Sequence, residues 1–318
     1  MSLSPNAQDQ SVAITITTFK RPDGIKALLA SVADLVEMAP GWSLDHLVVV
    51  DNDPAGSAET AIRAEFPHVH YVCEPEPGIA AARNRAVAEA LALGVSWVAF
   101  VDDDQTVTPT WLRELGTAAA QSSADAVVGA VRFTHPPGTP DWFIGLGVFG
   151  DRLVDEEDMA GYFSTNNLLL RVDPAPVEFP LFDLRFGLTG GSDHHLGARM
   201  RSSGRAIAYA PQAFADETVL IERVNGPAAV KRILRYGNVL TRVDVAVADE
   251  FGQPTLPVRA RAVAEGTARF AFGGVRAILR ARQGVQGVTS GLRTSFIGLG
   301  QIYAAGGGTV EEYRRQPR

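Results

Sequence analysis

The stretch Val98-Ala-Phe-Val-Asp102-Asp103-Asp104-Gln105 joins an apolar run directly to three consecutive carboxylates. Burying an unpaired carboxylate is costly, so acids at the end of a buried strand need a neutralising partner. A divalent cation is the usual partner, because Mg²⁺ and Mn²⁺ prefer oxygen ligands and often bridge to phosphates. The simpler interpretation is a solvated acidic turn.

Strand and helix patterns alternate along the chain on the N-terminal side of this stretch. Apolar, β-branched runs predict strands over 12–18, 47–50, 69–72 and 95–101. Helical spacing predicts helices around 28–36, 58–66 and 79–92. This alternation is typical of a parallel sheet with right-handed crossovers. Beyond Asp104 we expect two more strands, at 126–132 and 167–171, separated by a Pro/Gly-rich loop over 134–150 that could act as a lid.

Polar groups follow three of the predicted strands, at 17–21, 51–53 and 102–104, and a fourth polar segment at 78–84 opens a helix. Because parallel strands end at one edge of a sheet, we expect these groups to line a single crevice. The chain has neither a P-loop motif nor a dinucleotide fingerprint after a strand. Phosphates would therefore be held by a metal and by Arg or Lys side chains.

The composition is that of a soluble globular protein, with 318 residues, of which 46% are hydrophobic and 20% charged. Cys73 is the only cysteine, which excludes a disulfide framework and a thiolate metal site. The polar N-terminus lacks the apolar core of a signal peptide, and no apolar run reaches a membrane-spanning length. These features predict a cytoplasmic protein.

The charge is unevenly distributed along the chain. The net charge is −7, yet residues 255–318 carry ten arginines and three acids, a net charge of +7. The rest of the chain is acidic, which argues against general binding of nucleic acid. A basic C-terminal segment leaves open contact with an anionic membrane surface.

Four segments, in this order, resemble the inverting glycosyltransferases of family 2: Ile14-Thr-Ile-Thr-Thr-Phe-Lys-Arg21, Val49-Val-Asp51-Asn, Gly78…Ala82-Arg83-Asn84-Arg85, and Phe100-Val-Asp102-Asp103-Asp104. The resemblance implies a GT-A fold, that is, an α/β domain whose Rossmann-like, mixed but mostly parallel sheet is flanked by helices. The implied GT-A domain covers 1–240, with a nucleotide-sugar half at about 11–130 and an acceptor half at about 131–240. Residues 241–318 would form a basic helical extension.

Later segments extend the resemblance toward the bacterial exopolysaccharide branch of the family. They are Thr165-Asn166-Asn167-Leu-Leu-Leu-Arg171, Phe186-Gly-Leu-Thr-Gly190-Gly191-Ser192-Asp193-His194-His195-Leu196-Gly-Ala-Arg199, and Ala215-Asp216-Glu217-Thr218-Val219 with Arg223. The second of these is similar to the family's Gly-Gly-Glu-Asp-x-Asp segment, which supplies the catalytic base. The whole match spans about residues 11–240.

The resemblance implies contacts with the nucleotide-sugar donor for eight residues: Thr17, Phe19, Arg21, Asp51, Gly78, Arg83, Asp102 and Asp103. In this assignment Asp51 meets the base, Arg83 lies near the base or ribose, and Asp102 and Asp103 reach the ribose and sugar. Asp104, together with Asp102, would ligate Mg²⁺ or Mn²⁺ on the diphosphate.

The same resemblance makes Asp193 the base that deprotonates the acceptor hydroxyl. It places Asn166, Asn167, Gly191, His194 and His195 on the acceptor side. Two positions depart from the family pattern: Ser192 replaces a Glu, and His195 replaces an Asp. The first change bears on how the acceptor is oriented, and the second on the pKa of the base or on proton transfer through an imidazole.

Simpler structural roles stand beside three of these assignments. Asp51 could cap the helix that follows Pro54, and Asp193 could be the N-cap of a helix over 196–202. His194 and His195 are adjacent, so on a helix they point in different directions, and we expect one of them to be structural.

The C-terminal segment reads as a basic amphipathic helix. Phe272, Val275 and Leu279 share one flank, whereas Arg269, Arg276 and Arg280 line another. Such a helix suits the inner face of a membrane, and we expect peripheral contact through 255–303. The alternative is a helix packed on the catalytic domain with its arginines solvated. Glycines at 273, 274, 284 and 287 weaken a long uninterrupted helix.

The sequence therefore predicts an enzyme that moves a sugar from a nucleotide donor, expected to be UDP-linked, to a saccharide or lipid-linked acceptor with inversion. A nucleotidyltransferase would also use clustered acids and a metal, but Gly24 is the first glycine after the first strand, where that class needs a Gly-rich loop. A non-catalytic nucleotide-sugar-binding relative is a further alternative, motivated by Ser192 and His195. A retaining mechanism, with His135 or His195 as an extra metal ligand, is another.

Overall fold

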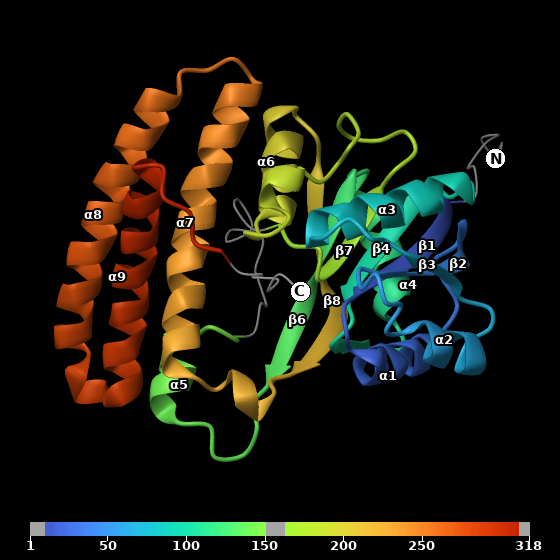
Figure 1. The fold of residues 1–318 in the computed structure, drawn as a ribbon, viewed down its shortest axis with the longest axis horizontal. Coiled ribbons are helices and arrows are strands. Elements are labelled where there is room, and N and C mark those ends of the chain that lie inside the picture. The colour runs from blue at the N-terminus through green and yellow to red at the C-terminus, as the bar shows by residue number, and fades with distance from the viewer. Residues whose placement is uncertain (1–9, 151–162, 312–318) are drawn as a thin grey trace, which may run out of the picture. The chain divides into compact units, whose positions relative to one another are not determined.

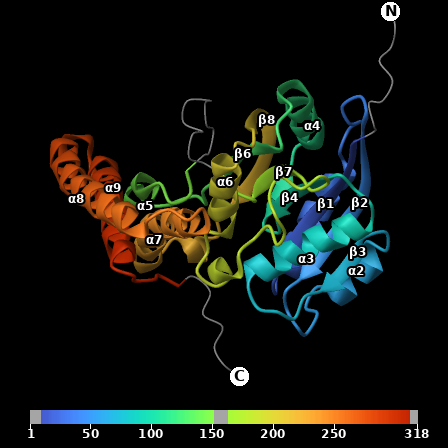
Figure 2. The same ribbon diagram turned by 90° about the horizontal axis from the view of Figure 1, so that it is seen from above.

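A computed structural model describes residues 10–150 and 163–311 of the chain. The chain divides into two compact units, which are described separately (Figures 1 and 2). The first unit comprises Met1–Arg132, Arg152–Leu184 and Arg199–Glu217, and the second comprises Phe133–Asp151, Arg185–Ala198 and Thr218–Arg318.

The first unit is built on an eight-stranded sheet with the strand order β3-β2-β1-β4-β7-β6-β8-β5. The strands are β1 (Gln10–Thr18), β2 (Trp42–Asp51), β3 (His70–Cys73), β4 (Trp97–Asp102), β5 (Gln105–Val107), β6 (Ala126–Thr134), β7 (Asn167–Arg171) and β8 (Ile207–Thr218). Strands β3, β2, β1 and β4 are parallel, whereas β7 is antiparallel to both β4 and β6, and β5 is antiparallel to β8. The expected mixed α/β sheet is confirmed.

Four helices flank this sheet: α1 (Pro22–Ala33), α2 (Glu59–Glu65), α3 (Ile79–Ala92) and α4 (Trp111–Ser122). Figure 1 shows α3 lying across the sheet, where it packs on β1 and β2. The central strands are buried on both faces, which explains their near-continuous apolar sequences. The helix α1 ends at Ala33, earlier than its apolar pattern suggests, and leaves Val36 exposed.

The segment 134–150 differs from the expected mobile loop, because it contains the helix α5 (Asp141–Leu146) in the second unit. Phe143, Leu146 and Phe149 are buried in one apolar cluster with residues of the C-terminal helices. A Cβ on Gly145 would lie 2.6 Å from the Cα of Gln286, so this helix is closely packed. The lid prediction is wrong, since the aromatic side chains between the prolines and glycines anchor the segment.

The second unit is mainly helical, with α6 (Ser192–Ser202) beginning in it and three long helices completing it: α7 (Gly226–Glu250), α8 (Thr255–Leu279) and α9 (Val285–Ala305). Helix α9 packs against α5, α7 and α8 (Figure 1). The expected domain boundary at residue 240 falls inside α7, which is continuous there. The helical extension therefore begins earlier than its basic composition indicates. Within the described residues, none of the helices has both the length and the apolar character needed to cross a membrane.

Gly273 and Gly274 do not interrupt α8, contrary to expectation, whereas Gly284 lies in the break between α8 and α9. Gly273 lies where a Cβ would come within 2.4 Å of Ser295 Oγ, and a Cβ on Gly298 would come within 2.3 Å of the Gly266 carbonyl oxygen. The helices α8 and α9 thus approach each other through backbone and small side chains. This contact compensates for the weak intrinsic helix propensity of glycine.

Candidate active site

The carboxyl ends of four parallel strands bring the predicted donor residues to one edge of the sheet in the first unit. In the strand register, Thr17 lies opposite Val50 of β2 and Asp102 of β4. Asp51 lies opposite Thr18 on one side and Cys73 on the other. The predicted convergence of these strand ends is confirmed.

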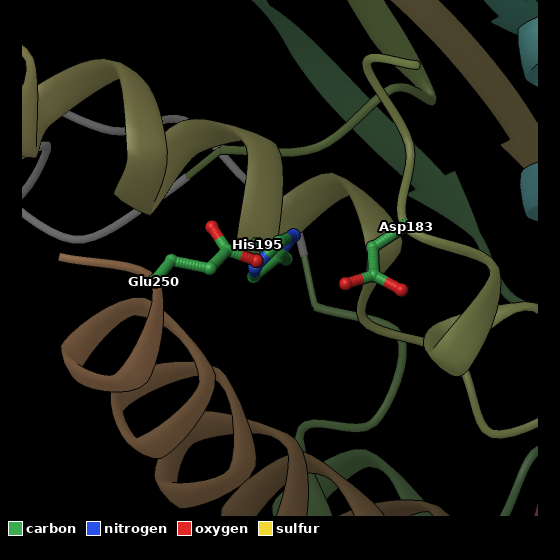
Figure 3. A group of neighbouring side chains, drawn as sticks. All are labelled: Asp183, His195 and Glu250. Atoms are coloured by element: carbon green, nitrogen blue, oxygen red, sulfur yellow. The ribbon is translucent and has the colours of Figure 1, made fainter. Parts of the chain in front are cut away.

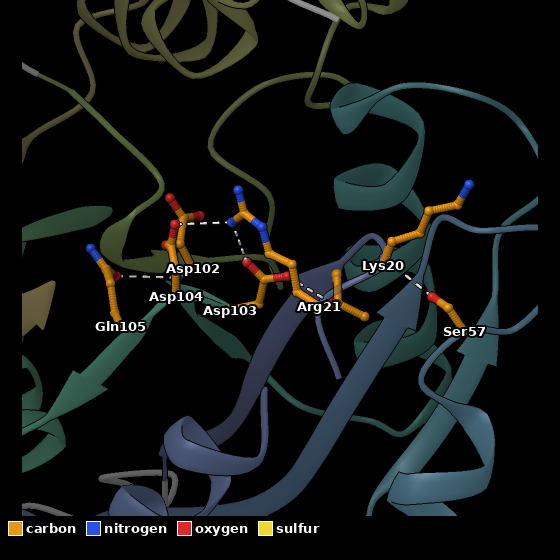
Figure 4. A network of polar contacts seen from close by, with 8 residues as sticks. Lys20, Arg21, Ser57, Asp102, Asp103, Asp104 and Gln105 are labelled. Atoms are coloured by element: carbon orange, nitrogen blue, oxygen red, sulfur yellow. Dashed lines mark hydrogen bonds and ion pairs between the residues drawn. The ribbon is translucent and has the colours of Figure 1, made fainter. Parts of the chain in front are cut away.

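Arg21 pairs with two of the three consecutive acids (Figure 4). Its Nη1 lies 2.9 Å from Asp103 Oδ1 and 2.9 Å from Asp104 Oδ2. The hydroxyl of Thr18 donates a hydrogen bond of 2.7 Å to the other oxygen of Asp103. Asp103 is buried and each of its oxygens accepts a hydrogen bond, whereas Asp102 and Asp104 are partly exposed. In this structure Asp103 anchors the acidic segment, and its contact with the nucleotide-sugar donor stays a prediction.

Burial raises the pKa of Asp103 above its usual range, and the nearby charge of Asp104 acts in the same direction. The charge of Arg21 and the hydrogen bond from Thr18 oppose this shift without cancelling it. For Arg21 itself, partial burial lowers the pKa, but the charges of Asp103 and Asp104 more than offset this, so the pKa is raised. Arg21 remains a fixed positive charge at the sheet edge.

The turn between β1 and α1 places Arg21 beside the acids. Lys20 adopts a left-handed conformation with φ of 57°, which is uncommon for a residue with a side chain. Its backbone N–H donates to Ser57 Oγ at 3.2 Å (Figure 4). Pro22 begins α1, and a Cβ on Gly24 would come within 2.5 Å of the Asp103 carbonyl oxygen. The first turn of α1 therefore lies directly against the acidic segment, a role of Gly24 that the sequence did not indicate.

Asp51 is fully buried and organises the loop after β2. Its Oδ2 accepts hydrogen bonds from the Ala58 N–H (2.8 Å) and the Tyr71 hydroxyl (3.0 Å), and its Oδ1 accepts one from the Asp53 N–H (2.9 Å). Burial, with the hydrogen bond to Asp51, raises the pKa of Tyr71, so its phenol stays protonated as a donor. Asp51 does not cap α2 (Glu59–Glu65), because its partner is the backbone N–H of Ala58, the residue before the helix, and no side chain of the described residues caps α2. Contact with a nucleotide base stays a prediction.

Asn52 links three segments at this edge, although sequence reasoning gave it no role. Its side-chain amide donates to the carbonyl oxygens of Glu74 (2.9 Å) and Glu76 (2.6 Å). Its Oδ1 accepts from the Gly78 N–H at 3.0 Å, where Gly78 has φ of 123° at the start of α3. No local pattern could have indicated this role, because the partners lie more than twenty residues away.

The other predicted donor residues surround this edge. Thr17 is half-buried in β1, and Phe19 is exposed just after the strand. Arg83, in the first turns of α3, is buried with its guanidinium 5.8 Å from the ring centre of Phe182. A cation–π contact at this distance fixes the direction of the arginine side chain.

Asn167 does not take the predicted acceptor-side position. It is fully buried, and its Nδ2 donates to the carbonyl oxygens of Ala130 and Ala213, both at 2.8 Å. Its Oδ1 accepts from Trp111 Nε1 at 2.8 Å. The amide thus joins β7 to neighbouring strands and to α4, and it exposes no atom to an acceptor. The adjacent Asn166 is half-buried and keeps its predicted role as a hypothesis.

In the second unit, Asp193 lies in the first turn of α6, which begins at Ser192, so it is not the N-cap. Its Oδ1 accepts from the backbone N–H of His194 at 2.8 Å and lies 3.2 Å from His194 Nδ1. The imidazole of His194 in turn makes an edge contact with Tyr236. Gly190 and Gly191 precede the helix with φ of 74° and 100°. This conformation explains the double glycine that precedes the helix.

His195 lies in the interior of the second unit, and its acceptor-side role stays a prediction. It is fully buried, its ring stacks on Phe186 with centroids 5.0 Å apart, and its Nε2 lies 3.0 Å from Glu250 Oε1 at the end of α7 (Figure 3). Glu250 also accepts a hydrogen bond from Arg185 at 3.0 Å. We expected either His194 or His195 to be structural, and the burial and packing of His195 agree with that expectation. His135, considered as an extra metal ligand, lies with Nε2 2.9 Å from the Phe149 carbonyl oxygen.

Comparison with known proteins places this arrangement in a family. The model of glycosyl transferase family 2 matches residues 13–171. The succinoglycan biosynthesis protein ExoM of Rhizobium meliloti (strain 1021) is 32% identical over 239 residues, which is 73% of this chain and 74% of ExoM.

Solved structures show the same fold at low sequence identity. The mannosyltransferase PcManGT from Pyrobaculum calidifontis, in complex with GDP-Man and Mn²⁺, has a TM-score of 0.55 at 18% identity, covering 89% of this chain and 85% of that chain. GalNAc-T7 with UDP, GalNAc and Mn²⁺ has a TM-score of 0.52 at 12% identity, covering 74% of this chain and 48% of that chain. These likenesses support the GT-A fold expected from the sequence.

Proposed function

The chain belongs to glycosyltransferase family 2, and on that premise we propose that it transfers a sugar from a nucleotide sugar, UDP-linked, to a saccharide or lipid-linked acceptor with inversion at the anomeric carbon. The reaction would be a step of polysaccharide biosynthesis, as the name of the relative ExoM suggests. One observation carries the proposal: four parallel strand ends gather acids and arginine at one edge of the sheet. Open α/β sheets bind ligands at this edge.

We assign Asp102 and Asp104 to a divalent cation, Mg²⁺ or Mn²⁺. Their carboxylates are hard oxygen donors, and both residues are partly exposed, whereas Asp103 is buried. Three acids lie next to one another here, and Arg21 pairs with two of them. Because Arg21 supplies only one positive charge, this edge of the sheet stays negative and can attract a cation. When bound, such a cation would stabilise the negative charge that develops on the departing nucleoside diphosphate.

The donor is held, in this proposal, by side chains around the same edge. Arg21 is a fixed cation that can contact a phosphate oxygen, and Thr17 and Phe19 lie beside it on β1 and the following turn. Arg83 would approach the base or ribose, together with the Gly78 backbone at the start of α3. Asp51 would act on the base through the loop that it orders, because its own carboxylate is buried.

We propose Asp193 as the general base. It accepts the proton of the acceptor hydroxyl while the acceptor oxygen forms a bond to the anomeric carbon and the bond from that carbon to the phosphate oxygen breaks. This single displacement inverts the anomeric centre. Asp193 lies in the first turn of α6, near the positive end of the helix dipole, and the contact with His194 orients its carboxylate. Asn166 and Gly191 remain proposed acceptor-side residues.

The alternative is a nucleotide-sugar-binding protein that has lost catalysis. Two observations favour it: Ser192 and His195 are fully buried, so neither can orient an acceptor as the residues that they replace would. This alternative and the enzyme share the donor site and differ in turnover.

Turnover of a panel of UDP-, GDP- and dTDP-sugars with Mn²⁺ distinguishes an active glycosyltransferase from a non-catalytic binding protein. We expect native protein to release nucleoside diphosphate with one donor and Asp193→Asn to lose about a hundredfold or more of that rate, the usual contribution of a general base. Donor binding should be unchanged in Asp193→Asn, and the exposed Asp34→Asn serves as the control that keeps full activity. Equal turnover in native protein and Asp193→Asn would remove Asp193 as the base. Binding without turnover by every donor and acceptor tested would favour the non-catalytic alternative.

A further inference from the structure

Helix α8 carries its large apolar side chains on the outside. Leu256, Phe272, Ile278 and Leu279 are 76%, 61%, 77% and 74% exposed, and Val263, Phe270 and Val275 are also exposed. A helix of a globular protein normally buries such residues and exposes polar ones. On α8 this order is reversed.

The buried side of α8 consists of small residues. Ala262, Gly266, Gly273 and Ala277 are buried, spaced by four, seven and four positions along one stripe of the helix. This stripe packs on α9, where a Cβ on Gly291 would come within 2.4 Å of the Ala277 backbone nitrogen. The exposed large apolar residues of α8 point away from this small-residue stripe, so they are not needed for the packing on α9. Their exposure requires another explanation.

The charges on the segment that contains α8 and α9 are almost all positive, although Asp244 of α7 lies close enough to act on the charge of Arg261. Between residues 255 and 303 the chain has seven arginines and one acid, Glu265. Glu265 accepts a hydrogen bond of 2.6 Å from Arg261, so its charge is locally compensated. Arg269 reaches Gln301 of α9 at 2.8 Å and so lies along the border between the buried stripe and the apolar face.

We propose that the outer face of α8 docks in the plane of an anionic bilayer surface. Its leucine, isoleucine and phenylalanine side chains would enter the acyl region, while the arginines along its border and in the following turn would lie at the level of the lipid phosphates. Positive charge beside an apolar face complements anionic headgroups. Two copies of the same face would bring these arginines together, which disfavours self-association.

The proposal assigns the contact to α8 rather than to the whole segment 255–303, because the most exposed apolar side chains, those of Leu256, Ile278 and Leu279, lie on α8. In α9, Val285, Leu292, Leu299 and Tyr303 are also exposed, but to a smaller extent. The proposal does not depend on sugar transfer, so it can fail or hold independently of the proposed function.

Co-sedimentation of the full chain with vesicles tests the proposal directly. With vesicles of phosphatidylglycerol and phosphatidylcholine we expect at least about tenfold stronger partitioning than with phosphatidylcholine alone, because each arginine near an anionic surface adds to binding. Ile278→Ser with Leu279→Ser should lower partitioning into the anionic vesicles about tenfold or more, since both residues would leave the acyl region. The fold is not at risk, because both side chains are exposed.

The matched control is Val36→Ser with Leu91→Ser, two exposed apolar residues of the first unit. This variant should bind vesicles as the native chain does. The proposal is overturned if native protein does not bind anionic vesicles, if binding is as strong without phosphatidylglycerol, or if the control loses as much binding. It is equally overturned if light scattering shows a dimer that Ile278→Ser with Leu279→Ser converts to a monomer, because the face would then be a contact between copies.

Discussion

The polar edge of the first unit and the α8–α9 pair of the second unit are held in place by opposite means. At the edge, buried polar side chains such as Asp51, Asn52 and Asp103 each make several hydrogen bonds. Between α8 and α9, contacts depend on the near absence of side chains at Gly273 and Gly298. The first arrangement fixes groups that can act on a ligand, and the second leaves large apolar groups on the surface. In both regions the usual burial of apolar groups and exposure of polar groups is reversed, and these are the two regions to which we assign proposed functions.

The largest effect on stability is expected where a buried amide is removed from the hydrogen-bonded sheet. Asn167→Ala leaves Ala130, Ala213 and Trp111 without their partner, which should cost about 3 kcal/mol or more, because each unsatisfied buried group costs about 1–3 kcal/mol. Denaturant unfolding measures the change. The matched substitution at the half-buried Asn166 should cost less than half as much, and an equal cost at both positions would contradict the structural role of Asn167.

Two adjacent glycines of α8 test the close packing between α8 and α9. Gly273→Ala should destabilise the protein by about 1–3 kcal/mol, because its new Cβ would meet Ser295 and Gly291. At Gly274 no atom lies within 4 Å of such a Cβ, so Gly274→Ala should stabilise the helix by about 0.5–1 kcal/mol. Thermal unfolding of the two variants shows whether each substitution raises or lowers the stability. A change in the same direction for both variants would show that the α8–α9 contact is looser than described.

The smallest effect concerns the pH dependence of stability at the acidic edge. Because burial raises the pKa of Asp103 above its unfolded value, the folded state holds this proton more tightly than the unfolded state. The corresponding stability is present at low pH and is lost as the pH rises through the folded pKa. Asp103→Asn cannot ionise, so we expect native protein to lose stability relative to this variant as the pH rises above the ordinary titration range of an aspartate. The measurement is guanidinium unfolding across and above this range, and the opposite trend would contradict the dominance of burial.

Most of the first unit could be predicted from the sequence, because each central strand is a local apolar run that ends at polar residues. The family motifs also located the acidic triplet, Arg21 and Asp193 within segments that the structure shows as strand ends and a helix start. The role of Asn52 could not be predicted, since its partners come from a loop and a helix start far along the chain. The buried position of Asn167 depends on contacts with three separate elements.

The second unit was harder to predict for a related reason. The aromatic residues of α5 lie among prolines and glycines, which locally indicate a loop, and their burial depends on α7 and α9. The glycines of α8 weaken a helix when considered alone, but they allow the close approach of α9. In both cases the deciding interaction joins residues that are distant in sequence.

The central claim is that Asp102 and Asp104 hold a divalent cation that binds the donor diphosphate. Isothermal titration calorimetry of UDP into the protein, with and without Mn²⁺, tests it most directly. We predict binding of UDP that requires Mn²⁺ in native protein, a loss of about tenfold or more in Asp104→Asn because a metal ligand is gone, and no loss in Asp193→Asn. No uptake of manganese or magnesium by native protein at saturating UDP, GDP or dTDP would contradict the account.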